Sequence, residues 1–166
     1  MVTKAFCECL IDVYHGEVSG EGFFSGLLGA AEDVDQRYVA GSMLQFETEG
    51  KAIMRPLLMR LGLTILEDPE IRGGGAAAAD ALNAFPWGER FAALRNVVES
   101  TYLPRYLELA TLVHADEDPE AARIATFMGT HERAVVSVGE NVLLGRPDPV
   151  APIAALLHFR LPRPPR

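Results

Sequence analysis

The sequence predicts an all-α protein: a bundle of four long helices, with a long crossover between the second and third helices and a short helix near the C-terminus. Over long segments the apolar residues recur with the helical period of about 3.6 residues. Runs of β-branched residues with a period of two, which would indicate strands, do not occur in the sequence. Short connections join the first predicted helix to the second and the third to the fourth, so each pair should be antiparallel.

The first helix is expected over residues 4–29, because apolar side chains fall on one face of a helical wheel there. The residues on this face are Phe6, Leu10, Val13, Phe24 and Leu28. The second helix is expected over residues 34–61, with Asp33 or Asp35 as its N-cap and Gly62 as its C-cap.

The third helix is expected over residues 86–113 and the fourth over residues 119–144. Asp118 is a typical N-cap for the fourth helix, and Gly145 is a typical stop. A short fifth helix is expected over residues 150–158.

Two prolines lie inside the predicted helices. Pro56 is expected to kink the second helix without ending it, since the apolar period continues beyond it. Pro104 is expected to bend the third helix.

The connection over residues 63–85 is long enough to return along the whole bundle. About 23 extended residues reach about 75 Å, whereas a helix of about 27 residues is roughly 40 Å long. Within it, Gly73-Gly74-Gly75 and the four alanines that follow are expected to form a flexible connection that leads into a short helical turn. Two short turns around one long crossover is the connectivity of ferritin-like bundles. The alternative is an up-and-down bundle in which residues 63–85 are a disordered insertion.

The composition indicates a single domain. Of the 166 residues, 49 % are apolar, which is enough to bury a hydrophobic core and too many for a disordered chain. We expect the domain to occupy residues 1–160. Residues 161–166 are rich in proline and arginine and are expected to form an extended tail.

The net charge of −8 limits the classes of partner. Acidic surfaces repel phosphates, so we expect no nucleic acid partner. No apolar run reaches the roughly 18 residues that a membrane span needs, so we expect no membrane partner. The N-terminal segment carries Glu8, Asp12 and Glu17, where a secretory signal would be uncharged. The expected location is therefore cytoplasmic.

Charged residues interrupt the apolar faces near the midpoint of each predicted helix. These residues are Glu17, Glu47, Glu99, and His131 with Glu132. Because the helices have similar lengths, residues at equal depth can meet at one cross-section of the bundle. Isolated ionised carboxylates in a core cost several kcal/mol each, so a divalent metal, protonation or ion pairing must neutralise them. For Glu47 the ion-pair partner would be Lys51, one helical turn away. For Glu99 it would be Arg95.

Carboxylate oxygens combined with an imidazole suit iron or manganese better than soft metals. The expected metal ligands are Glu17, Glu47, Glu99 and His131. The residues expected beside them, or as alternative ligands, are Glu21, Lys51, Glu132 and Tyr106. The alternative for His131 is a core histidine that is hydrogen-bonded to a carbonyl or a carboxylate.

Four phrases of the sequence are similar to a known family. They are Tyr14-His15-Gly16-Glu17-Val18 with Gly20-Glu21, Phe46-Glu47-Thr48-Glu49-Gly50-Lys51, Arg55-Pro56-Leu57-Leu58, and Thr130-His131-Glu132-Arg133-Ala134. In these phrases the chain resembles a group of small bacterial ferritin-like proteins of the di-iron carboxylate type. The resemblance implies a ferritin-like four-helix bundle with one or two iron or manganese ions between its helices.

The ligand motif of the di-iron bundles does not occur in this sequence. Those sites use Glu-x-x-His on two helices. Here Met128 precedes His131 by three residues, and Gly50 follows Glu47 by three. A mixed site with one ion and a metal-free core bridged by ion pairs therefore both stay open.

Two functions from different classes follow. In the first, the protein is a ferritin-like metalloprotein that uses iron or manganese as an oxidase or oxygenase, with oxygen or a small molecule as its substrate. In the second, it is a metal-free ferritin-like bundle that acts as an interaction or accessory module. A homodimer is the expected assembly if the chain associates with itself.

Overall fold

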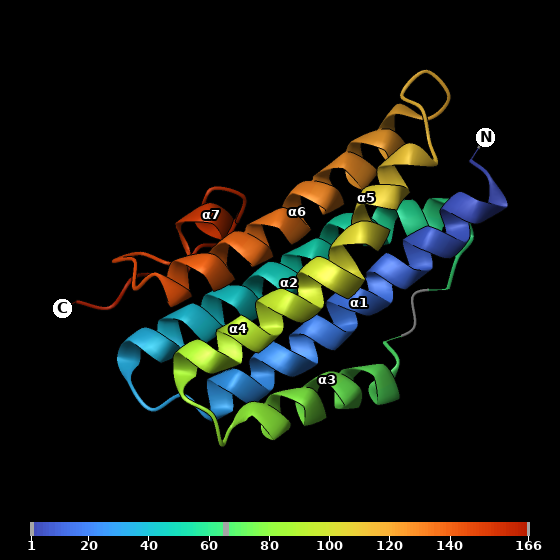
Figure 1. Cartoon of the computed structure of the whole chain (residues 1–166). Coiled ribbons are helices and arrows are strands. Elements are labelled where there is room, and N and C mark those ends of the chain that lie inside the picture. Colours follow the sequence, from blue (N-terminus) through green and yellow to red (C-terminus); the bar gives the residue numbers. More distant parts are fainter. Residues whose placement is uncertain (1, 65–66, 166) are drawn as a thin grey trace.

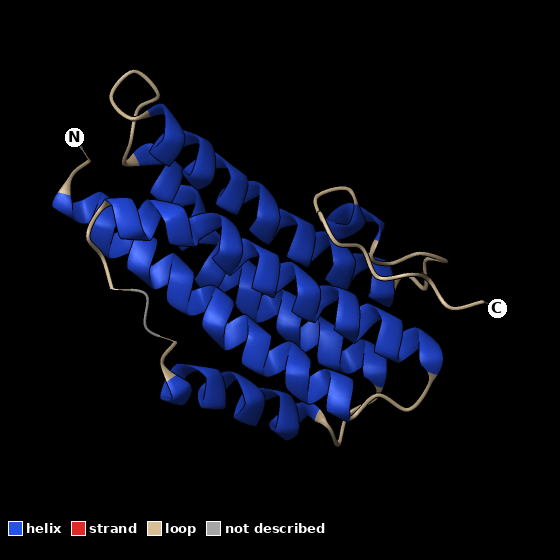
Figure 2. Ribbon diagram, turned by 180° about the vertical axis from the view of Figure 1, so that it is seen from behind, coloured by secondary structure: helices blue, strands red, loops and turns tan. Residues whose placement is uncertain are grey.

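The computed structural model describes residues 2–64 and 67–165, and every regular element in these ranges is a helix (Figures 1 and 2). The prediction of an all-α bundle is confirmed at this level. No helix in the same ranges has both the length and the apolar character that a membrane span requires.

The helices α1 (Lys4–Gly29) and α2 (Val34–Arg60) form an antiparallel pair, and their bounds match the predicted ones to within one residue. At the start of α2, Asp33 Oδ1 accepts a hydrogen bond of 2.8 Å from the Gln36 amide, which would otherwise have no partner in the helix. After α2, Gly62 has a φ of +70°, the left-handed conformation that favours glycine. The proline inside α2 does not end the helix, as predicted.

The glycine-rich connection forms a helix, α3 (Pro69–Leu82), which packs along α1. The prediction of a flexible connection is wrong, because glycine allows a backbone contact that outweighs its low helix propensity. A Cβ atom on Gly75 would overlap the backbone carbonyl of Ser19, and a Cβ atom on Gly22 would overlap that of Arg72. Only residues without side chains permit α1 and α3 to approach so closely.

The third predicted helix is continuous, but its geometry changes midway. It consists of α4 (Trp87–Val97), a π-helical turn η1 (Val98–Tyr102) and α5 (Leu103–Thr111). Pro104 lies just after the π-turn. Proline has no N–H to donate, and its ring clashes with the carbonyl four residues earlier, so the wider turn accommodates it. The disturbance predicted at Pro104 is thus a π-turn.

The helix α6 (Pro119–Leu143) has the start and the stop that were predicted, to within one residue. Asp118 Oδ1 accepts a hydrogen bond of 3.1 Å from the Ala121 amide. After α6, Gly145 has a φ of +61°.

The C-terminal helix α7 (Ala151–Ala154) is shorter than predicted. It ends early because the chain after it turns toward α2. There the Glu49 carboxylate accepts hydrogen bonds from the backbone amides of His158, at 2.7 Å, and Phe159, at 2.9 Å.

Figure 1 shows the path of the chain through the bundle. After α1 and α2, the helix α3 returns the chain along the outside of α1, so α4 begins at the end of the bundle where α2 begins. The α4–η1–α5 rod and α6 form a second antiparallel pair, which packs on the first pair through α1 with α5 and α2 with α6.

A layer of charged residues divides the hydrophobic core into two clusters. One cluster includes Phe6, Leu57, Leu109 and Ile124, and the other includes Phe24, Phe46, Phe91 and Val138. The buried charged layer between them consists of Glu17 and Glu21 of α1, Glu47 and Lys51 of α2, and His131 and Glu132 of α6. Residues near the midpoints of three helices therefore meet at one level of the bundle.

Candidate metal centre

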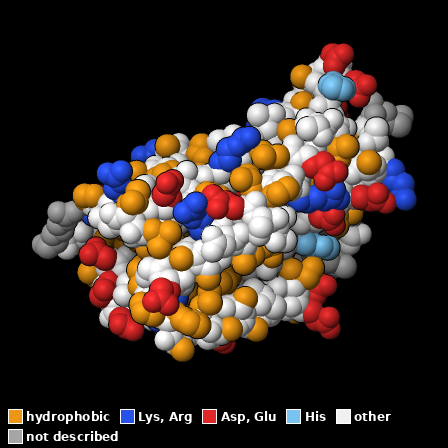
Figure 3. Space-filling model, viewed as in Figure 1, with side chains coloured by type: hydrophobic (Ala, Val, Ile, Leu, Met, Phe, Trp, Pro, Cys, Tyr) orange, Lys and Arg blue, Asp and Glu red, His pale blue; other side chains and the backbone are white. Residues whose placement is uncertain are grey.

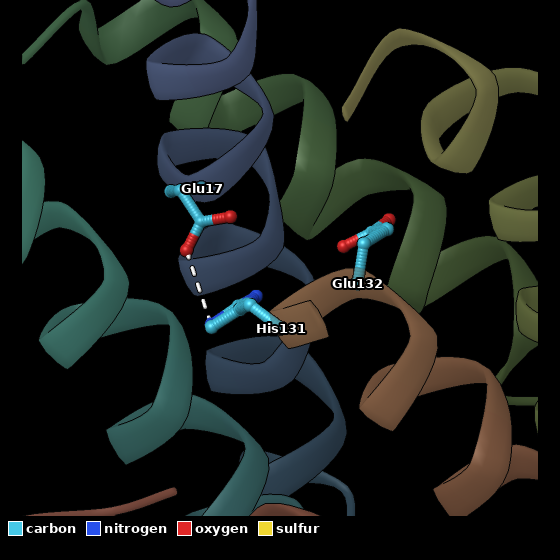
Figure 4. A group of neighbouring side chains, drawn as sticks. All are labelled: Glu17, His131 and Glu132. Atoms are coloured by element: carbon cyan, nitrogen blue, oxygen red, sulfur yellow. Dashed lines mark ion pairs between the residues drawn. The ribbon is translucent and has the colours of Figure 1, made fainter. Parts of the chain in front are cut away.

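Three buried side chains of the charged layer converge (Figure 4). Glu17 projects from α1, whereas His131 and Glu132 project from α6. One possible ligand atom of each lies within 4.8 Å of those of the other two, and Glu17 Oε2 is 3.4 Å from His131 Nε2. Glu17 and His131 are fully buried. Two carboxylates and an imidazole at this spacing could hold a divalent metal ion.

Glycines on α1 and α2 provide the room for these polar side chains. A Cβ atom on Gly50 would overlap Glu17 Oε2 and would lie 3.0 Å from His131 Nε2. Two further contacts of the same kind join Gly20 to the Glu47 carboxylate and Gly16 to the Tyr106 hydroxyl. The helices can therefore hold the site only where these positions have no side chain.

Phe46 fixes the ring of His131. The two rings are stacked, with centroids 3.7 Å apart and planes inclined by 7°. His131 Nε2 lies 3.2 Å from the Phe46 carbonyl oxygen, which places the ring hydrogen on Nε2 and leaves the lone pair on Nδ1. That Nδ1 atom is buried and has no hydrogen-bond partner among the described residues. Burial lowers the pKa of His131 to about 4, so the imidazole is neutral at pH 7, as metal binding requires.

Tyr106 on α5 orients Glu17. Its hydroxyl donates a hydrogen bond of 2.7 Å to Glu17 Oε1. Glu17 Oε2, the atom nearest His131, has no hydrogen-bond partner among the described residues. Burial, and then the charge of Glu17, raises the pKa of Tyr106 well above its ordinary value, so the hydroxyl stays protonated and remains a donor.

The carboxylates of the layer disfavour one another's ionisation. Burial, followed by the charge of Glu132, raises the pKa of Glu17 well above its ordinary value. Burial, followed by the charge of Glu17, does the same to the pKa of Glu47. Burial raises the pKa of Glu132 to about 8. Within the described ranges, no lysine or arginine forms an ion pair with any of these three carboxylates.

Lys51 does not pair with Glu47, although the sequence left that pair open. Lys51 Nζ donates hydrogen bonds to Glu21 Oε2 at 2.7 Å and to Glu67 Oε2 at 2.6 Å. Arg72 also forms an ion pair with Glu21. The charge of Lys51 is therefore matched inside a neighbouring ion-pair network rather than by the converging carboxylates.

Glu99 does not line the bundle interior, so its prediction as a metal ligand is wrong. Its side chain is 40 % exposed and forms an ion pair of 3.3 Å with Arg95, which was the alternative for this residue. The cause is the π-turn. Counting back seven residues, or two regular turns, from buried Tyr106 gives Glu99, but η1 inserts one additional residue, so Val98 is the buried residue instead.

The structure thus divides the predicted site residues into three groups. It brings together Glu17, Glu47, His131, Glu132 and Tyr106; it places Glu21 and Lys51 in the adjoining ion pairs; and it separates Glu99 from both. Sequence reasoning missed Glu67, and no pattern in its surroundings indicates its role. It also missed the site glycines, although Gly16, Gly20 and Gly50 each lie within about one helical turn of a buried glutamate.

No protein-family model matches the chain, and no curated protein or solved structure matches it significantly. The geometry of the candidate metal centre is therefore the basis for a functional proposal.

Proposed function

We propose that the protein is a ferritin-like metalloprotein in which Glu17, His131 and Glu132 bind an iron or manganese ion. The main support is the convergence of these three buried groups, together with the unpaired atoms Glu17 Oε2 and His131 Nδ1. An unsatisfied buried polar group costs about 1–3 kcal/mol, and a charged one costs more. A divalent cation would pair with both carboxylates and with the imidazole at once.

The donor chemistry fits such an ion. Carboxylate oxygens are ligands for manganese and iron, and a neutral imidazole is a common further ligand for iron. Glu47 lies in the same layer and has no ion-pair partner among the described residues, so it could serve as a ligand for a second ion. We propose one ion at the converging set and a second only if Glu47 ligates it.

The path of the chain supports the ferritin-like part of the proposal. Short connections join α1 to α2 and α5 to α6, whereas α3 returns the chain along the bundle between the two pairs. This order of short, long and short connections occurs in ferritin-like bundles, whose metal ligands project inward from facing helices.

An iron ion in this position would supply one-electron and oxygen chemistry. The residues of the chain would prepare the site for it. Tyr106 holds Glu17 through Oε1, and Phe46 holds the His131 ring; such contacts orient metal ligands and tune their basicity. Hydrophobic clusters lie on both sides of the layer. We therefore propose oxidase or oxygenase activity toward a small molecule.

Metal binding by chelator-treated protein tests the proposal. The protein would be titrated with Mn²⁺, and with Fe²⁺ under anaerobic conditions, and examined by elemental analysis and thermal unfolding. Wild-type protein is expected to take up stoichiometric metal and to unfold at a higher temperature with metal, because a ligand of the folded state stabilises that state. Glu17→Gln preserves the shape of the side chain and is expected to lower metal affinity by at least about tenfold.

The matched control is Glu99→Gln, which makes the same chemical change on an exposed helix face. It is expected to bind metal as the wild type does. A wild-type protein without stoichiometric metal, or equal affinity in Glu17→Gln, contradicts the proposal.

A metal-free accessory module is the second candidate, and one contact favours it. The hydrogen bond from His131 Nε2 to the Phe46 carbonyl satisfies that nitrogen in the way a structural core histidine would be satisfied. In this case metal would not change the unfolding temperature, and Glu17→Gln would be at least as stable as the wild type, because it removes an uncompensated buried acid.

A further inference from the structure

A cavity of about 510 Å³ opens beside the candidate metal centre. Its walls include Phe23 of α1, Ala78 of α3, Ala93 of α4 and Val98 of η1. Apolar side chains gather on this face of the molecule between α3 and α4 (Figure 3). Small-molecule sites typically have volumes of roughly 300–1,000 Å³ and mainly apolar linings with a few polar groups. The cavity has the size and the walls of such a site.

The polar groups of the cavity belong to the charged layer. Glu47, Glu132 and Tyr106 all line it. Glu47 is 4 % exposed and Glu132 is 5 % exposed, and within the described part of the chain neither accepts a hydrogen bond. Tyr106 contacts Glu17, and Glu132 belongs to the converging set, so one end of a bound molecule would lie beside the metal centre.

We propose that this cavity binds a small, mostly apolar molecule whose single polar end donates a hydrogen bond, as a primary amine or an alcohol does. The apolar walls favour a hydrocarbon body. Glu47 is not a member of the three-residue set, so with one ion bound its carboxylate is available as the acceptor for the polar end. A molecule with an anionic end is disfavoured, because burial and the neighbouring carboxylates already oppose negative charge in this layer.

That this molecule is the substrate rests on the proposed function, but its binding needs only the cavity and Glu47. The two ideas can therefore fail separately. Metal uptake without ligand binding would support the proposed function and contradict this inference. Ligand binding by a protein that takes up no metal would support this inference and contradict the proposed function.

The experiment uses the uncharged fluorescent probe N-phenyl-1-naphthylamine with the full-length protein, both chelator-treated and loaded with Mn²⁺. The bound probe would be displaced by decylamine, 1-decanol or decanoate, each below its micelle-forming concentration. The three competitors share a hydrocarbon body and differ only in the polar end. We expect decylamine and 1-decanol to displace the probe at concentrations at least tenfold lower than decanoate.

Two pairs of variants locate the site. Ala78→Trp places a large side chain in the cavity wall and is expected to reduce probe binding at least tenfold, whereas Ala77→Trp, at the exposed neighbouring position outside the cavity, should not. Glu47→Gln should weaken the binding of decylamine at least tenfold more than the binding of 1-decanol. The amide still accepts a hydrogen bond from either molecule, but it carries no charge to attract the ammonium group. Glu99→Gln should leave the binding of both competitors unchanged.

Three results would overturn the inference. The first is no saturable probe binding by the wild type. The second is equal displacement by all three competitors, and the third is equal probe binding by the two tryptophan variants. Loss of folding in one variant would not hide the answer, because the competitor series uses the wild type alone.

Discussion

At the scale of single residues, the buried acids depend on glycines. In a helix interior, glycine costs about 1 kcal/mol relative to alanine, so each such position weakens its helix unless the free space is used. At Gly50 the space is occupied by the Glu17 carboxylate and adjoins the His131 ring. Gly50 is therefore a positioning residue of the candidate centre, although it offers no ligand atom.

Gly50→Ala is expected to destabilise the protein by about 1–3 kcal/mol, because the added methyl group overlaps Glu17 in a packed core. Metal affinity should fall as well, since Glu17 must move. Gly73 is the control: it is an exposed helical glycine, and nothing lies within 4 Å of an added Cβ. Gly73→Ala should raise stability by up to about 1 kcal/mol. Urea unfolding measures the stability of both variants. Equal stability of Gly50→Ala and Gly73→Ala would contradict the role of Gly50.

The sequence identified candidate residues by one property, a charge on an apolar helical face. This property correctly placed Glu17 and His131 in the bundle interior, because α1 and α6 are regular and a helical wheel describes them. It failed for Glu99, because a wheel assumes a constant turn and α4–η1–α5 does not have one. It also could not rank Glu132 above Glu47, since only the packed helices show which carboxylate approaches His131.

At the scale of elements, α3 depends on a backbone contact rather than on its own helix propensity. Gly22 and Gly75 let α1 and α3 pack with backbone against backbone, and at Gly26 the backbone of α1 packs against the methyl group of Ala79. One ion pair, between Arg72 and Glu21, also joins the first turns of α3 to α1. Together these contacts hold the wall that α3 contributes to the cavity.

Gly75→Ala is expected to loosen α3, because its methyl group would overlap the Ser19 carbonyl and backbone atoms cannot move out of the way cheaply. We expect faster amide hydrogen exchange across α3, with smaller changes in α6. Gly74→Ala is the matched control, since nothing lies within 4 Å of a Cβ there. If Gly75→Ala and Gly74→Ala show the same exchange in α3, the backbone contact does not hold this helix.

Helices with clear end signals were predictable from the sequence, and those stabilised by contact were not. Asp33, Asp118, Gly62 and Gly145 act locally, so the bounds of α2 and α6 followed from the sequence within one residue. The helix α3 is different. Its three consecutive glycines disfavour a helix locally, and only the surface of α1 reverses that preference.

At the scale of the whole molecule, the charged layer has two electrostatically distinct parts. Toward α3, the basic side chains Lys51, Arg55 and Arg72 are matched by Glu21 and Glu67. Toward α6, the carboxylates have no basic partner within the described ranges. Lys51 forms its ion pairs with Glu21 and Glu67, and none with the carboxylates of the candidate metal centre.

The ion-paired part predicts a dependence of stability on acidity. Although burial alone would raise the pKa of Glu67, hydrogen bonds from Lys51, Arg55 and Tyr14 lower it from 4.5 to about 2. The unfolded chain thus binds this proton more readily than the folded one. The stabilisation is present above pH 4.5 and is lost as the pH falls toward 2. Glu67→Gln should therefore lower the unfolding temperature at pH 7, and its difference from the wild type should shrink toward pH 2.

Thermal unfolding of the wild type and Glu67→Gln across this range measures the effect, and the difference between the two proteins isolates it from the other carboxylates. A difference that stays constant from pH 7 to pH 2 would contradict the lowered pKa of Glu67. Added salt should reduce the difference at pH 7, since Glu67 is 41 % exposed and its ion pairs are partly screened.

The π-turn has a consequence for comparing this chain with others. A relative with a regular helix in place of α4–η1–α5 would need one residue fewer between Val98 and Tyr106 to keep both buried. The length difference would then fall inside a helix, where alignments rarely place a gap. An ungapped alignment would set Glu99 opposite an inward-facing position of the relative. If the relative had a metal ligand at that position, the alignment would wrongly assign the same role to Glu99.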